Sequence, residues 1–172
     1  MNAKQRIAIA LLTISAGAVV KIQVDEGYTD RAIIPVKGDR PTIGHGSTTR
    51  LDGSPVRMGD TTTPELAKQR TMAYLDNQSA QIKRCIRAPL HHVEFDVVND
   101  FAYQYGIGAL CKSSIASKVN AGDYAGACRA YLQYRFTAGY DCSTLVNGKP
   151  NKRCYGVWTR QQERYQKCMG VQ

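Results

Sequence analysis

The sequence lacks the residue spacings that usually bind metal ions or carry redox chemistry. No two cysteines stand two residues apart, as they do in zinc ribbons and CxxC motifs. The three histidines, His45, His91 and His92, form neither an HExxH nor an HxxxH pattern. We therefore expect no metal and no other cofactor. The chain also has little that could span a bilayer, because the uncharged stretch from Ile7 to Val20 falls short of the roughly 20 residues required.

Acidic residues are scarce. The chain has 14 Asp and Glu against 23 Lys and Arg, which gives a formal net charge of +9. A basic surface favours a polyanionic partner such as an acidic polysaccharide, an anionic membrane or nucleic acid, although many soluble proteins are simply basic. No nucleic-acid recognition motif is visible, and the basic residues are spread over both halves of the chain. We expect no specific nucleic-acid partner.

Internal repeats, low-complexity tracts and interdomain linkers are absent as well. A length of 172 residues indicates about one domain, and 43% hydrophobic with 22% charged residues is typical of globular proteins. Collagen-like, disordered and multi-span membrane classes are thereby excluded. The 15 glycines and 6 prolines scattered along the chain also exclude a coiled coil.

Cysteine is abundant. An even number without metal-binding spacing predicts three disulfides and an oxidising compartment; the alternative is six buried, reduced thiols. Two cysteines flank one polar loop, two lie on the last two long predicted helices, and two remain. The expected pairs are Cys142–Cys154, Cys128–Cys168 and Cys85–Cys111.

The N-terminus has the pattern of an export signal. Lys4 and Arg6 precede the weakly hydrophobic stretch Ile7 to Val20, which is rich in Ala and Gly. Three interpretations stay open: a cleaved signal with a cleavage site near residues 15–18, a retained weak anchor, or a buried first helix.

The remaining pattern predicts an α+β fold. Short strands over 32–36 and 42–44 flank the turn 37–40, and helices follow. Capping and periodicity place them at 64–86, 95–105, a short segment after Ser113 or Ser114, 124–134 and 158–169. Gly106 and Gly108 are expected to end the second of these, and Trp158 is expected in the core.

Chemistry is concentrated in one region. Glu26-Gly27 closes a predicted helix, and the glycine- and hydroxyl-rich segment 42–48 follows 16 residues later. Alternating glycines let a ligand approach the backbone closely, and hydroxyls suit the positioning of a water or a sugar. On these residues alone, a surface glutamate beside a turn is the commoner outcome.

Four ordered motifs give this region a family resemblance. The phage-type lysozymes of glycoside hydrolase family 24 are resembled by Glu26-Gly27 with Pro41–Gly44, by the segment 102–108, by 112–114 with 120–124, and by Gly156–Arg164. The resemblance spans roughly residues 24–170. It implies a lysozyme-like fold, with a small N-terminal β lobe, a helical C-terminal lobe and an active-site cleft between them. It also implies hydrolysis of the β-1,4 bonds between N-acetylmuramic acid and N-acetylglucosamine in peptidoglycan.

The same resemblance implies the catalytic residues. Glu26 matches the proton donor, and we expect its pocket to raise its pKa. Thr42 matches the hydroxyl that helps to hold the attacking water. The second carboxylate of the family is missing, because Pro35 and Val36 stand where it is expected. Asp39 is the nearest substitute, and its alternative role is that of an ordinary turn residue.

Three further residues are candidates for substrate binding. His45 lies within the motif, and a packed or cleft-lining histidine is a more common outcome than a catalytic one. Gln104 and Tyr105 match a cleft-lining region of the family, with core packing as the alternative for Tyr105.

The N-terminal stretch resembles that of signal-arrest-release endolysins, whose weak anchor is exported uncleaved and later leaves the bilayer. This resemblance divides the chain into an arrest segment (1–22) and a catalytic domain (23–172). It implies a monomeric endolysin, exported to the host periplasm, tethered at first to the inner membrane through residues 7–20, that lyses the host. After release, we expect residues 7–20 to form a helix that buries Leu11, Leu12 and Ile14.

Two other functions remain open. The missing carboxylate is compatible with a lytic transglycosylase, which uses a lone glutamate. A non-catalytic, disulfide-rich module that binds the cell wall would also be basic and exported.

Overall fold

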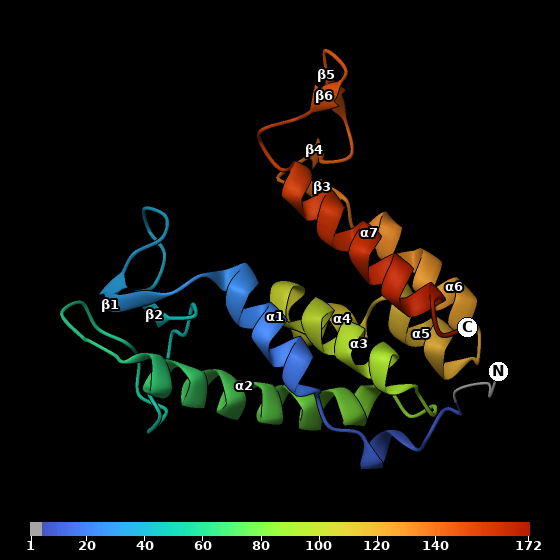
Figure 1. Cartoon of the computed structure of the whole chain (residues 1–172), viewed down its shortest axis with the longest axis horizontal. Helices are drawn as coiled ribbons and strands as arrows, with labels where there is room; N and C mark the ends of the chain where they lie inside the picture. The colour runs from blue at the N-terminus through green and yellow to red at the C-terminus, as the bar shows by residue number, and fades with distance from the viewer. Residues whose placement is uncertain (1–4) are drawn as a thin grey trace. The chain divides into compact units, whose positions relative to one another are not determined.

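The computed structural model describes residues 5–172, and its architecture is α+β, as the sequence predicts. The chain forms two compact units. The smaller unit comprises residues 13–81, and the larger one combines the described residues up to Leu12 with residues 82–172. The partition of the sequence at residues 22 and 23 stays a prediction. Figure 1 shows the order of the elements along the chain.

The smaller unit carries the strands next to the candidate catalytic residues. Its elements are α1 (Ala16–Glu26), β1 (Thr29–Ile33), β2 (Thr42–Gly44) and most of α2 (Pro64–Cys85). The Ser15 hydroxyl caps α1 by accepting a hydrogen bond from the Ala18 amide, at 3.1 Å. Thr63 caps α2 in the same way, and Pro64 occupies the first helical position, where its missing N–H costs nothing.

Strands β1 and β2 pair in antiparallel register, with Thr29 opposite Gly44 and Ile33 opposite Thr42. Strand β1 begins and ends three residues before the predicted range 32–36. The shift has a physical reason: Pro35 has no N–H to donate to a ladder, so the chain leaves the sheet and turns. The turn is closed by a hydrogen bond of 2.9 Å from the Asp39 amide to the Val36 carbonyl.

The larger unit is mainly helical. Its helices are η1 (Ile9–Leu11), α3 (His92–Tyr105), α4 (Ile107–Cys111), α5 (Ser114–Asn120), α6 (Tyr124–Ala130), η2 (Tyr131–Gln133) and α7 (Tyr155–Met169). Its strands are β3 (Phe136–Thr137), β4 (Tyr140–Asp141), β5 (Leu145–Val146) and β6 (Lys149–Pro150). Its core is lined by fully buried aromatic and aliphatic side chains, including Phe95, Phe101 and Tyr131.

Some predicted boundaries in this unit are wrong by a few residues. The helix expected over 124–134 ends at Ala130 and tightens into η2, and α7 begins at Tyr155 instead of Trp158. Gly108 lies within α4, so Gly106 alone ends α3, with φ at 85°. Trp158 is partly exposed, not a core residue.

Three disulfides stabilise the larger unit: Cys85–Cys111, Cys128–Cys168 and Cys142–Cys154. These are the three pairs expected from the sequence. A disulfide limits the freedom of the unfolded chain and typically contributes about 2–4 kcal/mol to stability.

Strands β3 to β6 form two successive hairpins, which Figure 1 places at the N-terminal end of α7. Each has a two-residue turn with positive φ at both positions: Ala138 and Gly139 in the first, Asn147 and Gly148 in the second. This geometry matches the twist of the flanking strands, and Asn-Gly is its preferred sequence. Ala138 adopts this left-handed conformation although alanine tolerates it less well than glycine or asparagine.

The sequence led us to expect one helix over residues 7–20, but the structure breaks this stretch into separate elements. Ile7 exchanges two backbone hydrogen bonds of 3.0 Å with Leu90, η1 follows, and α1 starts at Ala16. Leu12 is buried, Ile14 is partly buried, and Leu11 is 74% exposed. The break occurs because Leu12 adopts an extended conformation and Ser15 caps a new helix. Lys4 lies outside the described residues, and no helix described here is both long and apolar enough to cross a bilayer.

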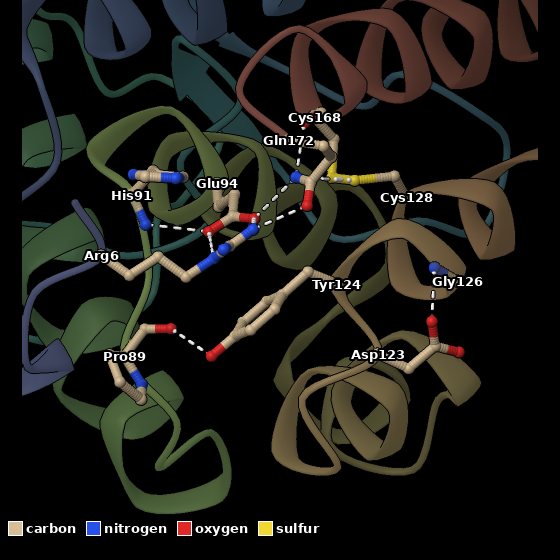
Figure 2. A network of polar contacts seen from close by, with 10 residues as sticks. All are labelled: Arg6, Pro89, His91, Glu94, Asp123, Tyr124, Gly126, Cys128, Cys168 and Gln172. Atoms are coloured by element: carbon tan, nitrogen blue, oxygen red, sulfur yellow. Dashed lines mark hydrogen bonds and ion pairs between the residues drawn. A yellow bond between two sulfur atoms is a disulfide. The ribbon is translucent and has the colours of Figure 1, made fainter. Parts of the chain in front are cut away.

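Both ends of the described chain meet at one buried carboxylate (Figure 2). Glu94 on α3 is only 4% exposed and accepts four hydrogen bonds. Two come from Arg6, at 3.0 and 2.8 Å, one from the His91 amide at 2.8 Å and one from the Gln172 side chain at 2.9 Å. The Arg6 guanidinium also lies 3.6 Å from the ring centroid of Tyr124, a favourable cation–π distance.

The charge state of Glu94 should control stability at acid pH. Burial alone would raise the pKa of Glu94, but the hydrogen bonds from Arg6, Gln172 and His91 outweigh it and lower the pKa below 4.5. Because the pKa is lower in the folded state, the ionised carboxylate stabilises the protein above the unfolded pKa. This stabilisation is lost as the pH falls through the folded pKa.

We predict that Arg6→Ala lowers the free energy of unfolding at pH 7 by about 2–3 kcal/mol, because it leaves Glu94 buried with fewer donors. The loss should shrink as the pH falls through the lowered pKa of Glu94, because the protonated carboxyl no longer carries a charge that needs Arg6. Urea denaturation over a series of pH values from 7 downwards measures it. Lys118→Ala is the matched control, since its ion pair with Asp123 is exposed and should contribute less than about 1 kcal/mol. Equal losses in the two variants, or a loss independent of pH, would contradict the prediction.

Candidate active site

Glu26 is the last residue of α1, and its side chain is exposed. Gly27 ends the helix with φ at 72°, a conformation that favours glycine. The preceding turn is held by an ion pair of 2.6 Å between Lys21 and Asp25. The sequence therefore places the candidate acid at a fixed helix end, beside the first strand.

A tight turn after β2 brings backbone to this carboxylate. Ile43 and Ser47 exchange two backbone hydrogen bonds of 3.0 Å, and the glycines between them, Gly44 and Gly46, have φ of 66° and 78°. A Cβ added to Gly46 would lie 3.5 Å from Oε2 of Glu26. Gly46 therefore places backbone, and no side chain, next to the carboxylate.

His45 stands between these two glycines and contacts the residues after Glu26. Its Nδ1 lies 2.5 Å from the Gly27 carbonyl oxygen, and its ring centroid lies 5.6 Å from that of Tyr28. A carbonyl oxygen can only accept, so Nδ1 carries the proton and donates it in this hydrogen bond. In the structure, His45 ties the turn to the end of α1. Its expected role in substrate binding stays a prediction.

Thr42 and Asp39 lie on the β1–β2 hairpin in different environments. Thr42 is partly buried and pairs with Ile33 across the sheet. Asp39 is exposed in the turn that follows Pro35. The structure therefore places Glu26, His45 and Gly46 close together. Asp39 lies in a solvent-exposed turn, and this position fits both of its expected roles.

An ion pair supports the hairpin from the loop before α2. Arg50 donates two hydrogen bonds to Asp60, at 2.8 and 2.7 Å, and the Arg57 amide donates a third at 3.0 Å. The hydrogen bonds from Arg50 lower the pKa of Asp60 to about 2. The Asp60 carbonyl in turn accepts the amide of Ala32 in β1, at 2.9 Å, so this loop fixes the position of the strand.

Gln104 and Tyr105, the other candidate binding residues, belong to the larger unit. The Tyr105 hydroxyl donates to the Tyr134 carbonyl at 3.0 Å and accepts from the Gln161 side chain at 2.9 Å. Burial raises the pKa of Tyr105, which keeps the hydroxyl protonated for this donation. The ring stacks on Phe101, with centroids 4.6 Å apart, so packing accounts for Tyr105. Gln104 is partly buried, and substrate binding by either residue stays a prediction.

Two buried polar residues on α7 were not predicted from the sequence. Gln161 is fully buried, and Arg164, 2% exposed, donates to the Asp100 carboxylate at 2.7 Å. The signal for their burial was present: Cys168 must face inward to form its disulfide, and residues 164 and 161 lie one and two turns before it. Residues 5–172 contain no cluster of His, Cys, Asp and Glu able to hold a metal ion.

The architecture matches that of phage endolysins. The solved endolysin of Escherichia coli O157:H7 phage FAHEc1 aligns over 92% of this chain and 94% of its own, with a TM-score of 0.74 and 27% identity. The endolysin of Salmonella phage P22 is 27% identical over 143 residues, which are 83% of this chain and 97% of that protein. The SAR-endolysin of Enterobacteria phage H19B is 29% identical over 180 residues, 99% of each chain. The fold is thus lysozyme-like.

The match to a family model is more specific. The model of the phage lysozymes matches residues 23–153, and the chain belongs to this family. It is therefore an enzyme, a glycoside hydrolase of the lysozyme type that acts on peptidoglycan, and the resemblance of its motifs is confirmed.

We predict that Gly44→Ala destabilises the protein by about 3 kcal/mol or more. The new Cβ would be strained at positive φ and would lie 2.8 Å from the Cβ of Ala67 on α2. Gly46→Ala is the matched control, because its φ is similar while its Cβ meets only ordinary contact distances. It should lose only about 1–2 kcal/mol. Thermal unfolding of both variants tests this, and equal losses would exclude the contact with Ala67 as a cause.

Proposed function

We propose that this phage lysozyme is an endolysin that degrades peptidoglycan to lyse its host, with Glu26 as the general acid. The observation that supports this assignment is the position of the Glu26 carboxylate at the end of α1, beside the side-chain-free Gly46. A helix C-terminus carries partial negative charge, which disfavours a carboxylate there and favours the protonated acid. Sugar rings bound over the exposed side chain would exclude water and strengthen this effect.

The proposed reaction is hydrolysis of the bond between N-acetylmuramic acid and N-acetylglucosamine. Glu26 gives its proton to the bridging oxygen as the bond from this oxygen to the anomeric carbon breaks. A water molecule, held by the Thr42 hydroxyl, forms a new bond to the anomeric carbon. The Asp39 carboxylate accepts the proton that this water loses, and the product is a reducing sugar end.

We predict that Glu26→Gln lowers the rate of peptidoglycan hydrolysis by at least about 100-fold, because glutamine cannot donate the proton. Its melting temperature should stay near that of the wild type, since the side chain is exposed. Turbidity loss of permeabilised Gram-negative cells measures the rate. Activity close to that of the wild type would refute the assignment.

Asp39→Asn and Thr42→Ala serve as the comparison in the same assay. If Asp39 accepts the proton of the water, its variant should lose far more rate than stability; an ordinary turn residue should affect neither. Mass spectrometry of the products separates the competing chemistry. Reducing ends indicate a hydrolase, whereas anhydro-muramic ends would indicate a transglycosylase. A transglycosylase is the alternative because the family carboxylate is missing at positions 35 and 36.

We also propose that residues 7–20 hold the exported, monomeric enzyme at the inner membrane until they are released into the periplasm. Small residues make the stretch too weakly apolar to be held firmly in lipid. In the tethered state Arg6 stays on the cytoplasmic side and cannot reach Glu94. The buried positions of Ile9 and Leu12 are likewise compatible only with a segment outside the bilayer. Glu26 follows the segment by six residues, so tethering would restrain the catalytic end of α1.

We predict that Gly17→Leu with Ala18→Leu keeps the protein in the membrane and blocks lysis, because it adds apolar bulk to the segment. The folded enzyme should tolerate the first change, since a Cβ on Gly17 meets only the Ser15 hydroxyl, at 3.9 Å. Membrane fractionation and the time course of lysis measure the effect, with Gly17→Ser and Ala18→Ser as the matched control. Lysis on schedule by the leucine variant, or a mature protein that begins near Val19, would rule out arrest and release.

A further inference from the structure

The two hairpins before α7 expose apolar side chains that have no part in the proposed reaction. We define the hairpin surface as residues 135–153. Four of its large apolar side chains are 46–60% exposed: Phe136, Tyr140, Leu145 and Val146. These side chains come from β3, β4 and β5, and β6 pairs with β5. Figure 1 shows the hairpins extending beyond the end of α7. Exposed apolar residues gathered in one place often mark an interaction site.

The hairpin surface is held rigidly. The Cys142–Cys154 disulfide closes its base. The Asn151 side chain donates to the carbonyls of Cys142 and Thr144, both at 3.0 Å, and accepts from the Cys154 amide at 2.9 Å. With both turns in the twisted two-residue form, the backbone keeps the apolar side chains outward.

Positive charge surrounds these apolar side chains. Residues 135–153 contain four basic residues and one acidic residue, for a net charge of +3. The basic residues are Arg135, Lys149, Lys152 and Arg153. Asp141, the single acid, lies 3.1 Å from the Arg135 guanidinium, so its charge is compensated locally. The combination of apolar and cationic groups suits a partner that is apolar inside and anionic at its surface.

A hollow of about 350 Å³ within this surface is poorly suited to a sugar. Two of its lining residues already have polar partners: Oδ1 of Asp141 accepts from the Ser143 amide and hydroxyl, and the Thr144 hydroxyl donates to the Asp141 carbonyl. The Arg153 guanidinium lies 3.3 Å from the Tyr140 ring centroid and covers that face of the ring. A glycan would find few open hydrogen-bonding groups here.

We propose that the hairpin surface binds the interface of a bilayer that contains anionic phospholipids. Leu145, Val146 and the two aromatic rings enter the headgroup region, where tyrosine is a favoured interfacial residue. The lysines and arginines meet the lipid phosphates. This contact belongs to the folded enzyme and is separate from the N-terminal segment. It would keep a released enzyme at the membrane surface.

Sedimentation of the full-length protein with vesicles tests the proposal. The vesicles contain phosphatidylcholine with or without a quarter of phosphatidylglycerol. Leu145→Ser with Val146→Ser should lower partitioning onto the anionic vesicles by about tenfold or more. Lys149→Gln with Lys152→Gln should lower it by up to about fivefold per lysine, and only when anionic lipid is present.

The matched control is Leu51→Ser with Met58→Ser, which removes two apolar side chains of similar exposure, 51% and 59%, from the smaller unit. It should bind vesicles like the wild type. All variants should keep their rate on purified peptidoglycan, which shows that they fold. Unchanged vesicle binding by the two hairpin variants overturns the proposal, as does an equal loss in the control. Lost binding to insoluble peptidoglycan with intact vesicle binding would also overturn it and assign the surface to the cell wall.

Discussion

The carboxylate of Glu94 can be buried only because donors surround it, and the strongest of these donors comes from the sixth residue of the chain. A buried charge without a partner is costly, so this pair fixes where the N-terminal stretch lies in the folded protein. Ile7 can then pair with Leu90, and Ile9 and Leu12 can enter the core. Gln172 closes the same group from the C-terminus. One acidic side chain thereby connects both ends of the described chain to α3.

Elements with local signals could be predicted from the sequence. Helix α2 runs from Pro64 to Cys85, within one residue of the predicted range 64–86. Ser113 and Asp123 cap α5 and α6, because each side chain accepts a hydrogen bond from the amide three residues ahead, wherever the rest of the chain lies. The N-terminal stretch could not be predicted in this way. Its conformation depends on Leu90 and Glu94, which are more than 80 residues distant in sequence.

The candidate site likewise has features that follow from local sequence signals and features that depend on distant residues. Glu26-Gly27 and the glycines around His45 carry their geometry in short sequence patterns, so the helix end and the tight turn were foreseeable. The Asp60 carboxylate that fixes β1 through the loop was not, since only the folded loop brings Arg50 to it. Gln161 and Arg164 are buried although their residue types favour the surface. Their position follows from the helical face that they share with Cys168, and the predicted disulfide of Cys168 already required this face to point inward.

All three disulfides lie between residues 85 and 168, and the smaller unit contains no cysteine. Segments inside and outside the disulfide loops therefore respond differently to a protease. A cut between Leu145 and Pro150 leaves the pieces joined through Cys142 and Cys154, and the same holds within the loops that the other two bonds close. A single cut between residues 13 and 81 separates the N-terminal piece from the rest of the chain as soon as the fold opens. Against proteolysis, the covalent integrity of the enzyme therefore depends on the segments outside the disulfide loops: the chain before Cys85, with α1, most of α2 and the hairpin between them, and residues 112–127.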